Sequence, residues 1–267
     1  MGTAFLDDRG IVDVEGTDAR ALLQRLLTSD MLALRPGQAR YAALLSPQGK
    51  IAFDFLVHDA TPDGGPDRFL LDVPATQAAD LARKLTQYRL RAAVVIVDRS
   101  AELGVTAHWP DGPGAPDPRH PALGTRAVEA RGAPDPAARL AYERHRIALG
   151  IPDGGRDFAY GDAFPHDANL DRLGGVDFAK GCYVGQEVVS RVHHRGTARK
   201  RIVPVRFEGR APAPGTEVSV GEIAIGTMGT SVEDRGLAMV RTDRAEEAAA
   251  LGAPPMADGI HLVLSLS

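Results

Sequence analysis

The only cysteine of the chain lies between two glycines in the segment Lys180-Gly181-Cys182-Tyr183-Val184-Gly185-Gln186-Glu187. A cation close to a thiol lowers the thiol pKa and raises the thiolate fraction, which a nucleophile or a metal ligand requires. We therefore expect Lys180 to assist Cys182. Gly181 and Gly185 permit positive φ or close approach of another backbone. The alternative is that Cys182 packs as a small hydrophobic residue.

A basic stretch follows this segment, because residues 188–207 contain no acidic side chain. Its charged and titratable residues are Arg191, His193, His194, Arg195, Arg199, Lys200, Arg201 and Arg206. In an acidic protein, such a stretch predicts a strand that binds an anion: carboxylate, phosphate or RNA backbone. A solvated charged strand is the alternative. Adjacent histidines on a strand face opposite ways, so we do not expect His193 and His194 to share a metal ion.

The composition is that of a folded, mildly acidic, soluble protein. The 267 residues include 31 basic and 35 acidic side chains, a net charge of −4, with 44% hydrophobic residues. These values exclude a disordered, collagen-like or coiled-coil chain. One cysteine excludes an intrachain disulfide, a Cys-rich zinc site and a cluster bound by four thiolates of one chain. An iron–sulfur cluster could only be shared with a partner.

The sequence predicts a cytoplasmic protein without a membrane partner. No apolar run approaches the roughly 18 residues that a membrane helix needs. The first ten residues carry Asp7 and Asp8 where a secretion signal would carry Lys or Arg.

The first hundred residues show the mixed pattern of an α+β domain. Periodic leucines after Thr17 or Asp18 predict a helix, and Ser46-Pro47-Gln48-Gly49 predicts a hairpin turn. The expected elements are strands at 10–14, 41–45, 51–57 and 68–73, a helix at 75–88, and a buried β-branched strand at 92–97.

The remaining chain predicts a loop-rich middle and a β-rich end. Prolines between 110 and 121 indicate an exposed loop, and a helix is expected from Pro136 to Leu149 before a long Gly/Asp-rich loop. Short strands at 202–207, 217–220, 222–228, 237–242 and 260–266 favour a small barrel or sandwich. We expect an α+β domain at 1–100 that exchanges segments with the next, a second at 101–200, and a β-barrel at 201–267.

The segment 180–187 resembles the signature of the YgfZ/Iba57 folate-binding proteins, which are related to the aminomethyltransferase (T-protein) of the glycine cleavage system. Further matches occur in order at Gly16-Thr17-Asp18-Ala19, Gln48-Gly49-Lys50, 146–152, Pro165-His166-Asp167-Ala168-Asn169-Leu170 and 191–201. The resemblance implies a GcvT/YgfZ-like ring of three domains that binds a tetrahydrofolate, with a C-terminal β-barrel. It also implies a role in maturing or repairing iron–sulfur proteins.

The resemblance assigns roles to individual residues. Cys182, with Lys180, is the functional group, and Cys182 could ligate a transient cluster shared with an A-type scaffold or client protein. Asp167, in its Pro-x-acid setting, would accept two N–H bonds from the pterin of a reduced folate. The other implied folate-binding residues are Arg146, Tyr183, Gln186, Glu187, Arg191 and Arg199.

Other functions remain open at this stage. The T-protein carries paired aspartates where this chain has Phe53-Asp54, so we do not expect glycine-cleavage activity, although a folate-dependent one-carbon transferase is an alternative. A cysteine hydrolase with His193 or His194 as base is another. Binding of tRNA is disfavoured, because only 5% of the residues are aromatic and offer little surface for base stacking.

Overall fold

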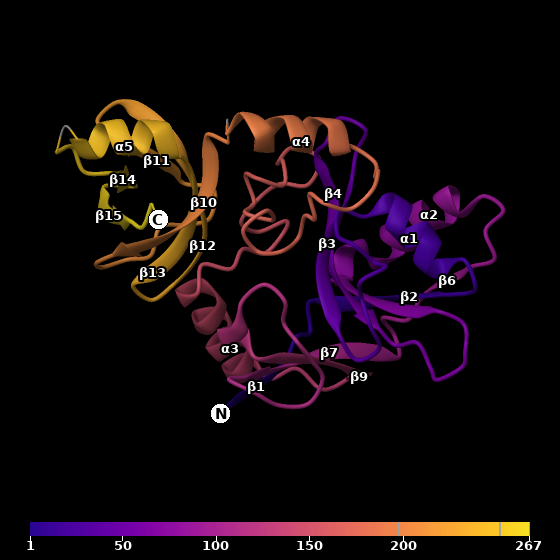
Figure 1. Ribbon diagram of the computed structural model, residues 1–267. Helices are drawn as coiled ribbons and strands as arrows, with labels where there is room; N and C mark the ends of the chain where they lie inside the picture. The colour runs from indigo at the N-terminus through magenta and orange to yellow at the C-terminus, as the bar shows by residue number, and fades with distance from the viewer. Residues whose placement is uncertain (197, 251, 267) are drawn as a thin grey trace.

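Three sheets surround an irregular central segment in the computed structural model, which describes residues 1–196, 198–250 and 252–266 (Figure 1). The strand orders are β3-β4-β5-β2-β6 in a five-stranded sheet, β1-β7-β9-β8 in a four-stranded sheet, and β10-β13-β12-β11-β14-β15 in a closed barrel. The predicted α+β fold with a C-terminal β-barrel is confirmed. None of the helices among the described residues is long and apolar enough to cross a membrane.

The five-stranded sheet is built from the segments that the sequence predicts. Its strands are β2 (Arg9–Glu15), β3 (Ala39–Leu45), β4 (Ile51–Asp59), β5 (Arg68–Pro74) and β6 (Val95–Asp98). The helices α1 (Ala19–Leu26) and α2 (Ala78–Arg89), the latter preceded by the 3₁₀ turn Ala75–Gln77, bury their leucines against one face of this sheet. The hairpin of β3 and β4 and the position of α1 agree with the predicted pattern.

Strand β6 differs from its prediction. It lies at the edge of the sheet, paired only with β2, and the side chain of Val95 is 61% exposed. The prediction that this β-branched run is buried was wrong, because β-branched residues favour extended backbone on an edge strand as well as in the interior.

The four-stranded sheet joins the N-terminus to the middle of the chain. It contains β1 (Gly2–Phe5), β7 (Leu103–Trp109), β8 (Ala115–Pro116) and β9 (Thr125–Ala130), and β1 pairs antiparallel with β7. The helix α3 (Pro136–Ala148) begins after an Asp135 cap and packs beside β1. The Pro-rich segment is not wholly exposed, because Asp117 and Arg119 within it are buried as an ion pair. A short 3₁₀ turn, Pro121–Leu123, ends that segment.

The barrel has its own apolar core and one helix. Its strands are β10 (Lys200–Phe207), β11 (Glu217–Val220), β12 (Ile223–Val232), β13 (Arg235–Arg241), β14 (Met256–Ala257) and β15 (Ile260–Leu264), and α5 (Thr242–Ala250) follows β13. Inward-facing residues such as Val205, Val218 and Leu262 fill its interior.

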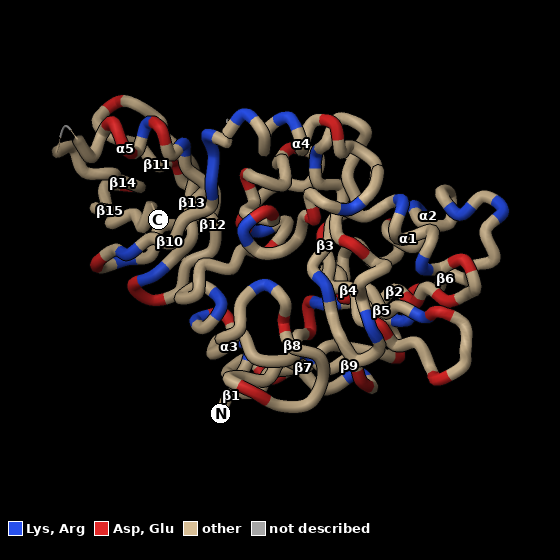
Figure 2. Tube along the Cα trace, in the orientation of Figure 1, with Lys and Arg blue, Asp and Glu red and all other residues tan. Residues whose placement is uncertain are grey.

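The central segment between α3 and the helix α4 (Gln186–Arg195) contains no helix or strand, yet many of its apolar residues are buried. Phe158, Leu170 and Tyr183 pack with side chains from β3, α3 and the barrel. Helix α4 then runs between the β3–β4 hairpin and β10 (Figure 1). The prediction of a basic strand was wrong for residues 188–195, which are helical, and Figure 2 shows the basic residues along this helix and the start of β10.

Candidate functional site

The thiol of Cys182 is exposed on the loop that leads into α4. Gly185 caps this helix with φ of 80°, and a Cβ there would lie 2.6 Å from the carbonyl oxygen of Ser46 in the hairpin turn. Both conditions require glycine. A Cβ on Gly181, in contrast, would meet no atom within 4 Å. Of the two glycines in the signature, therefore, only Gly185 is required by its backbone conformation and by the close approach of another backbone.

The ammonium of Lys180 is bonded to backbone carbonyl groups. Its side chain is 8% exposed, and its ammonium donates to the carbonyl oxygens of Gln24 at 2.7 Å and Ser29 at 3.1 Å, and also to that of Leu27. An ammonium has three N–H groups, and these acceptors use all of them. Burial lowers the pKa of Lys180 to about 8. These bonds tie the cysteine loop to the end of α1, and the activation of Cys182 by Lys180 stays a prediction.

The rest of the signature lies around α4 in different environments. Tyr183 is buried, and its hydroxyl has no hydrogen-bond partner among the described residues; burial raises its pKa to about 12. Gln186 begins α4 and is half-buried. Glu187 is exposed and lies 3.6 Å from Arg191, one turn later. The exposed Arg199 contributes its backbone carbonyl to a hydrogen bond from Thr242.

Arg146 is the centre of a buried ion-pair network. It is fully buried, and it donates to Glu143 at 2.8 and 2.9 Å, to Asp157 at 3.0 Å, to Thr230 at 2.9 Å and to the carbonyl of Ile151 at 2.9 Å. These bonds occupy all five guanidinium N–H groups. The prediction that Arg146 holds a folate carboxylate was wrong, because it has no donor left.

This network joins α3, the central segment and barrel strand β12. Burial opposes ionisation of Glu143, but the hydrogen bonds and charge of Arg146 outweigh it and lower the pKa of Glu143 to about 2. Asp157 also accepts from the Thr230 backbone at 2.7 Å. The network therefore fixes the barrel against the rest of the chain.

A second buried set of charges links the two open sheets. Asp72 of β5 pairs with Arg9 at 2.5 Å and Arg126 at 2.6 Å, and Asp117 pairs with Arg126 at 3.0 Å and Arg119 at 2.7 Å. Each carboxylate has two arginine partners, so the buried charges compensate one another. These residues position the sheets and have little solvent contact.

Asp54 is the one carboxylate of this chain at Phe53-Asp54, the position where the T-protein carries paired aspartates. It is buried and accepts from the hydroxyls of Tyr41 at 2.8 Å and Tyr160 at 2.5 Å. Burial raises the pKa of Asp54, although the hydrogen bonds from both tyrosines oppose the shift. Phe53 packs against the core of the sheet. The sequence alone does not indicate either tyrosine. Tyr160 is distant from Asp54 in the chain, and Tyr41 belongs to no motif.

A cavity of about 470 Å³ opens beside Tyr160, where the five-stranded sheet meets the central segment; we call it the junction cavity. Several polar side chains take part in its lining: Asp8, Arg9, Gln77, Asp153, Arg156 and Tyr160. The Oε1 atom of Gln77 is buried and has no hydrogen-bond partner among the described residues. A ligand with N–H donors would satisfy this oxygen.

Asp167 is half-buried in the central segment and does not line the junction cavity. Its Oδ2 accepts from the backbone N–H of Phe164 at 3.0 Å, and burial raises the pKa of Asp167. None of the residues that the sequence assigned to folate lines the junction cavity. In the part of the chain that the structure describes, no group of three or more His, Cys, Asp or Glu side chains could hold a metal ion.

Two family models match the chain. The GCVT N-terminal domain matches residues 7–116, and the CAF17 C-terminal beta-barrel domain matches residues 199–266. The structure also resembles the glycine cleavage system aminomethyltransferase T from Bartonella henselae, with a TM-score of 0.72 and 18% identity over 98% of this chain and 84% of that one. At this identity the likeness shows the fold alone.

Curated relatives share more sequence. The mitochondrial iron-sulfur cluster assembly factor IBA57 of Homo sapiens is 32% identical over 85% of this chain and 72% of its own length, and that of Mus musculus is 33% identical over 89% and 77%. The homologue of Mycosarcoma maydis is 37% identical over 76% of this chain. The chain spans 57% of that protein and 55% of the Neurospora crassa homologue, a little over half of each.

These comparisons correct one prediction and establish the family. The relatives are described as mitochondrial, so the prediction of a cytoplasmic location was wrong. The acidic residues near the start of the sequence, on which that prediction was based, do not define a compartment. Because its identity to the human protein extends over 72% of that protein, the chain belongs to the IBA57 family of iron–sulfur cluster assembly factors with an aminomethyltransferase-like fold.

Proposed function

We propose that this protein is an accessory factor in iron–sulfur cluster assembly or repair and that Cys182 is the residue through which it acts. The relatives named above are iron-sulfur cluster assembly factors. The observation that carries the proposal is a single exposed thiol on a loop that is fixed at both ends, by Lys180 before it and Gly185 after it.

The geometry suits an iron–sulfur cluster that is ligated jointly with a partner protein rather than by this chain alone. One thiolate is too few to hold a cluster alone, since clusters are usually ligated by four side chains. An exposed thiol lets a partner that supplies the other ligands approach, and a fixed loop reduces the entropy lost when the two proteins bind. An A-type scaffold or a client protein is the kind of partner that we propose, with the cluster as cargo.

Cells that lack the protein provide the test. The Cys182→Ala variant should fold with unchanged thermal stability and abundance, because the thiol is exposed, yet fail to restore the activity of iron–sulfur enzymes. Gly181→Ala, next to it on the same loop, is the matched control and should restore activity fully. Full complementation by Cys182→Ala at normal abundance would remove the thiol from the function.

We also propose a reduced folate, tetrahydrofolate or a derivative, as the ligand of the junction cavity. Its volume lies within the range of about 300–1,000 Å³ that is typical of small-molecule sites. The unpartnered Oε1 of Gln77 would accept an N–H of the pterin's aminopyrimidine edge, and Arg156 would face the acidic part of the ligand. Binding of the pterin by Asp167 stays a prediction, and Asp167 is the alternative location for the folate.

Calorimetric titration with tetrahydrofolate distinguishes the two locations. Gln77→Met preserves side-chain length and should weaken binding by about tenfold, whereas the exposed Gln48→Met serves as the control and should not. Loss of affinity in Asp167→Ala with full affinity in Gln77→Met would move the ligand to Asp167. Turnover of a methylamine donor with tetrahydrofolate would instead support the one-carbon transferase alternative.

A further inference from the structure

Two large apolar side chains are exposed in segments that adjoin the cysteine loop at 180–185. Leu32, in the segment that follows α1, is 57% exposed, and Phe178, just before the loop, is 36% exposed. A single exposed apolar side chain needs no explanation, but several in neighbouring segments indicate an interaction surface. We call the exposed residues of 31–34 and 178–182 the thiol face; they are Leu32, Ala33, Phe178, Ala179, Gly181 and Cys182.

Hydrogen bonds hold the two segments of the thiol face side by side. The backbone N–H of Asp177 donates to the carbonyl oxygen of Thr28 at 2.9 Å, and the ammonium of Lys180 donates to that of Ser29 at 3.1 Å. Phe178 is four residues before the cysteine, so the two Cα atoms lie within about 14 Å of each other. A standard interface covers about 800 Å² on each partner, which is a disc of about 16 Å radius. An interface centred on the thiol therefore reaches Phe178.

The charged groups within these segments are bonded to backbone groups. Asp30 accepts from the N–H of Leu32 at 3.0 Å, and Asp177 accepts from the N–H groups of Ala179 at 2.8 Å and Lys180 at 3.1 Å. The side chain of Lys180 is itself buried. The exposed residues of the thiol face are consequently all uncharged. Depletion of charge is typical of the core of a protein–protein interface.

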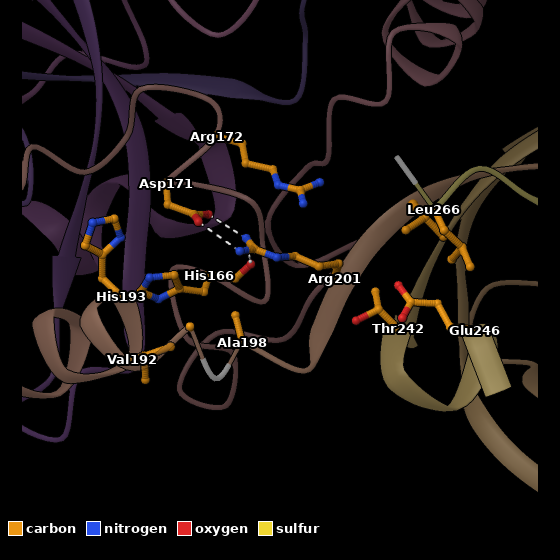
Figure 3. Close-up of a pocket in the computed structure, with 12 residues that line it drawn as sticks. His166, Asp171, Arg172, Val192, His193, Ala198, Arg201, Thr242, Glu246 and Leu266 are labelled. Atoms are coloured by element: carbon orange, nitrogen blue, oxygen red, sulfur yellow. Dashed lines mark hydrogen bonds and ion pairs between the residues drawn. The ribbon is translucent and has the colours of Figure 1, made fainter.

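The two apolar side chains belong to fixed parts of the chain. The ring of Phe178 is stacked on that of His193 in α4, with 3.7 Å between centroids, and His193 lies beside His166 (Figure 3). The carbonyl oxygen of Leu32 accepts from Arg35 at 2.7 Å. Groups that are already ordered lose little entropy when a partner binds. Aromatic residues are also enriched in the cores of interfaces.

We propose that the thiol face is the docking surface for the protein that shares a cluster with Cys182, and that Phe178 and Leu32 are its apolar anchors. The inference rests on the proposed function, because a partner that shares the cluster must come within bonding distance of the thiol. It adds the chemistry of the partner, whose surface around its own cluster ligands is apolar rather than acidic or basic. Such a contact depends little on salt, unlike binding through exposed charges.

Complementation of cells that lack the protein tests the proposal whichever protein the partner is. Leu32→Ser and Phe178→Ser should each weaken docking about tenfold or more, and the double variant should restore little iron–sulfur enzyme activity at normal abundance. Leu140→Ser on α3 and Ile223→Ser on the barrel are matched controls, since these side chains are 42% and 60% exposed. Both controls should restore activity fully, and the conservative Phe178→Leu should restore most of it.

Overexpression separates weak docking from loss of the thiol. Mass action offsets a lower affinity, so about tenfold overexpression should restore activity with the double variant but not with Cys182→Ala. The double variant should keep the thermal stability and the Cys182 alkylation rate of the native protein. If it is less stable, Leu32→Ser alone decides, because that side chain is more than half exposed. Failure of overexpression to restore activity with a stable variant would overturn docking as the role of these side chains.

The remaining outcomes distinguish this inference from the proposed function. Full activity of the double variant at normal abundance, with no activity of Cys182→Ala, would overturn the docking surface and leave the proposed function intact. Full activity of both would overturn the proposed function and this inference with it. The charge reversals Arg25→Glu on α1 and Arg195→Glu on α4, at exposed positions, should restore activity. Loss of activity in these two, with full activity of the double variant, would show that charge rather than apolar contact holds the partner.

Discussion

The ammonium of Lys180 lies 2.7 Å from the carbonyl oxygen of Gln24 and so joins the cysteine loop to the C-terminal end of α1. Carbonyl groups at the end of a helix have no intrahelical partners, and a buried cation satisfies them while interacting favourably with the helix dipole. The signature lysine therefore positions the loop that carries the thiol.

Replacement of Lys180 by Met should destabilise the protein by about 1–3 kcal/mol at pH 7, because the backbone carbonyls lose their donor. Urea unfolding measures the change. Reactivity of Cys182 towards an alkylating reagent at low urea provides a second measurement, and we expect only a small change, since the thiol is already exposed. A large fall in alkylation rate would show that Lys180 does activate the thiol.

The same residue predicts a dependence of stability on pH. The pKa of Lys180 is about 8 in the folded protein against 10.5 for a free lysine. Between these values the unfolded chain binds more protons, so folding becomes more favourable as pH rises. The stability of the native protein relative to Lys180→Met should therefore increase from pH 8 to pH 10. A constant difference would contradict the lowered pKa.

The two glycines of the signature should respond differently to alanine. Gly185→Ala should cost about 1–3 kcal/mol, because its positive φ is strained for alanine and its Cβ would press on the Ser46 carbonyl. Gly181→Ala should change stability by less than about 0.5 kcal/mol, since its Cβ enters open space. Thermal unfolding of the pair measures both effects. Equal losses would mean that the loop packs differently from this description.

Local pattern explains what the sequence predicted well. The leucine spacing of α1, the hairpin turn before Gly49 and the alternation of short strands each depend on neighbours in the chain, and the structure has all three. Edge or interior position is not a local property, which is why β6 was placed wrongly. The basic stretch was predicted to be a strand because its charged residues gave no indication of the helix that begins after Gly185.

Long-range contacts explain what the sequence could not give. Lys180 is two residues from Cys182 but bonds to residues more than 150 positions away, and Tyr160 reaches Asp54 across 106 positions. Arg146 likewise meets Thr230 from 84 positions away. A motif indicates which residues matter, whereas only the fold decides whether their donors point at a ligand or at other protein groups.

Arg146→Met should be far more destabilising than Arg191→Met, although both remove one positive charge. Loss of the buried arginine leaves the buried Asp157 without this guanidinium and removes one of the three arginines that pair with Glu143, which costs about 3–5 kcal/mol. The exposed Arg191 pairs with Glu187, one turn away, and its loss should cost less than about 1 kcal/mol. Urea unfolding of the two variants gives the comparison.

The acid sensitivity of Arg146→Met supplies an independent check. The pKa of Glu143 is lowered from 4.5 to about 2 in the native protein, so its contribution to stability is present above pH 4.5 and is lost as pH falls through 2. Without Arg146 that contribution should shrink, because Arg139 and Arg156 still pair with Glu143, and acid unfolding should begin at higher pH. An unchanged acid transition would show that other groups set the pKa of Glu143.

Asp167→Asn should stabilise the protein near neutral pH, by up to about 1 kcal/mol. Burial raises the pKa of Asp167, so above that pKa the folded state holds a carboxylate whose ionisation is disfavoured. Asparagine removes this cost, and its side-chain oxygen can still accept the N–H of Phe164. The advantage should vanish as pH falls below the ordinary aspartate pKa of about 4, where the carboxyl is protonated in both states. Unfolding at pH 7 and pH 3 measures both limits. A less stable Asn variant at pH 7 would mean that the nearby cations Lys50 and Lys200 dominate over burial and that Asp167 is held as an anion.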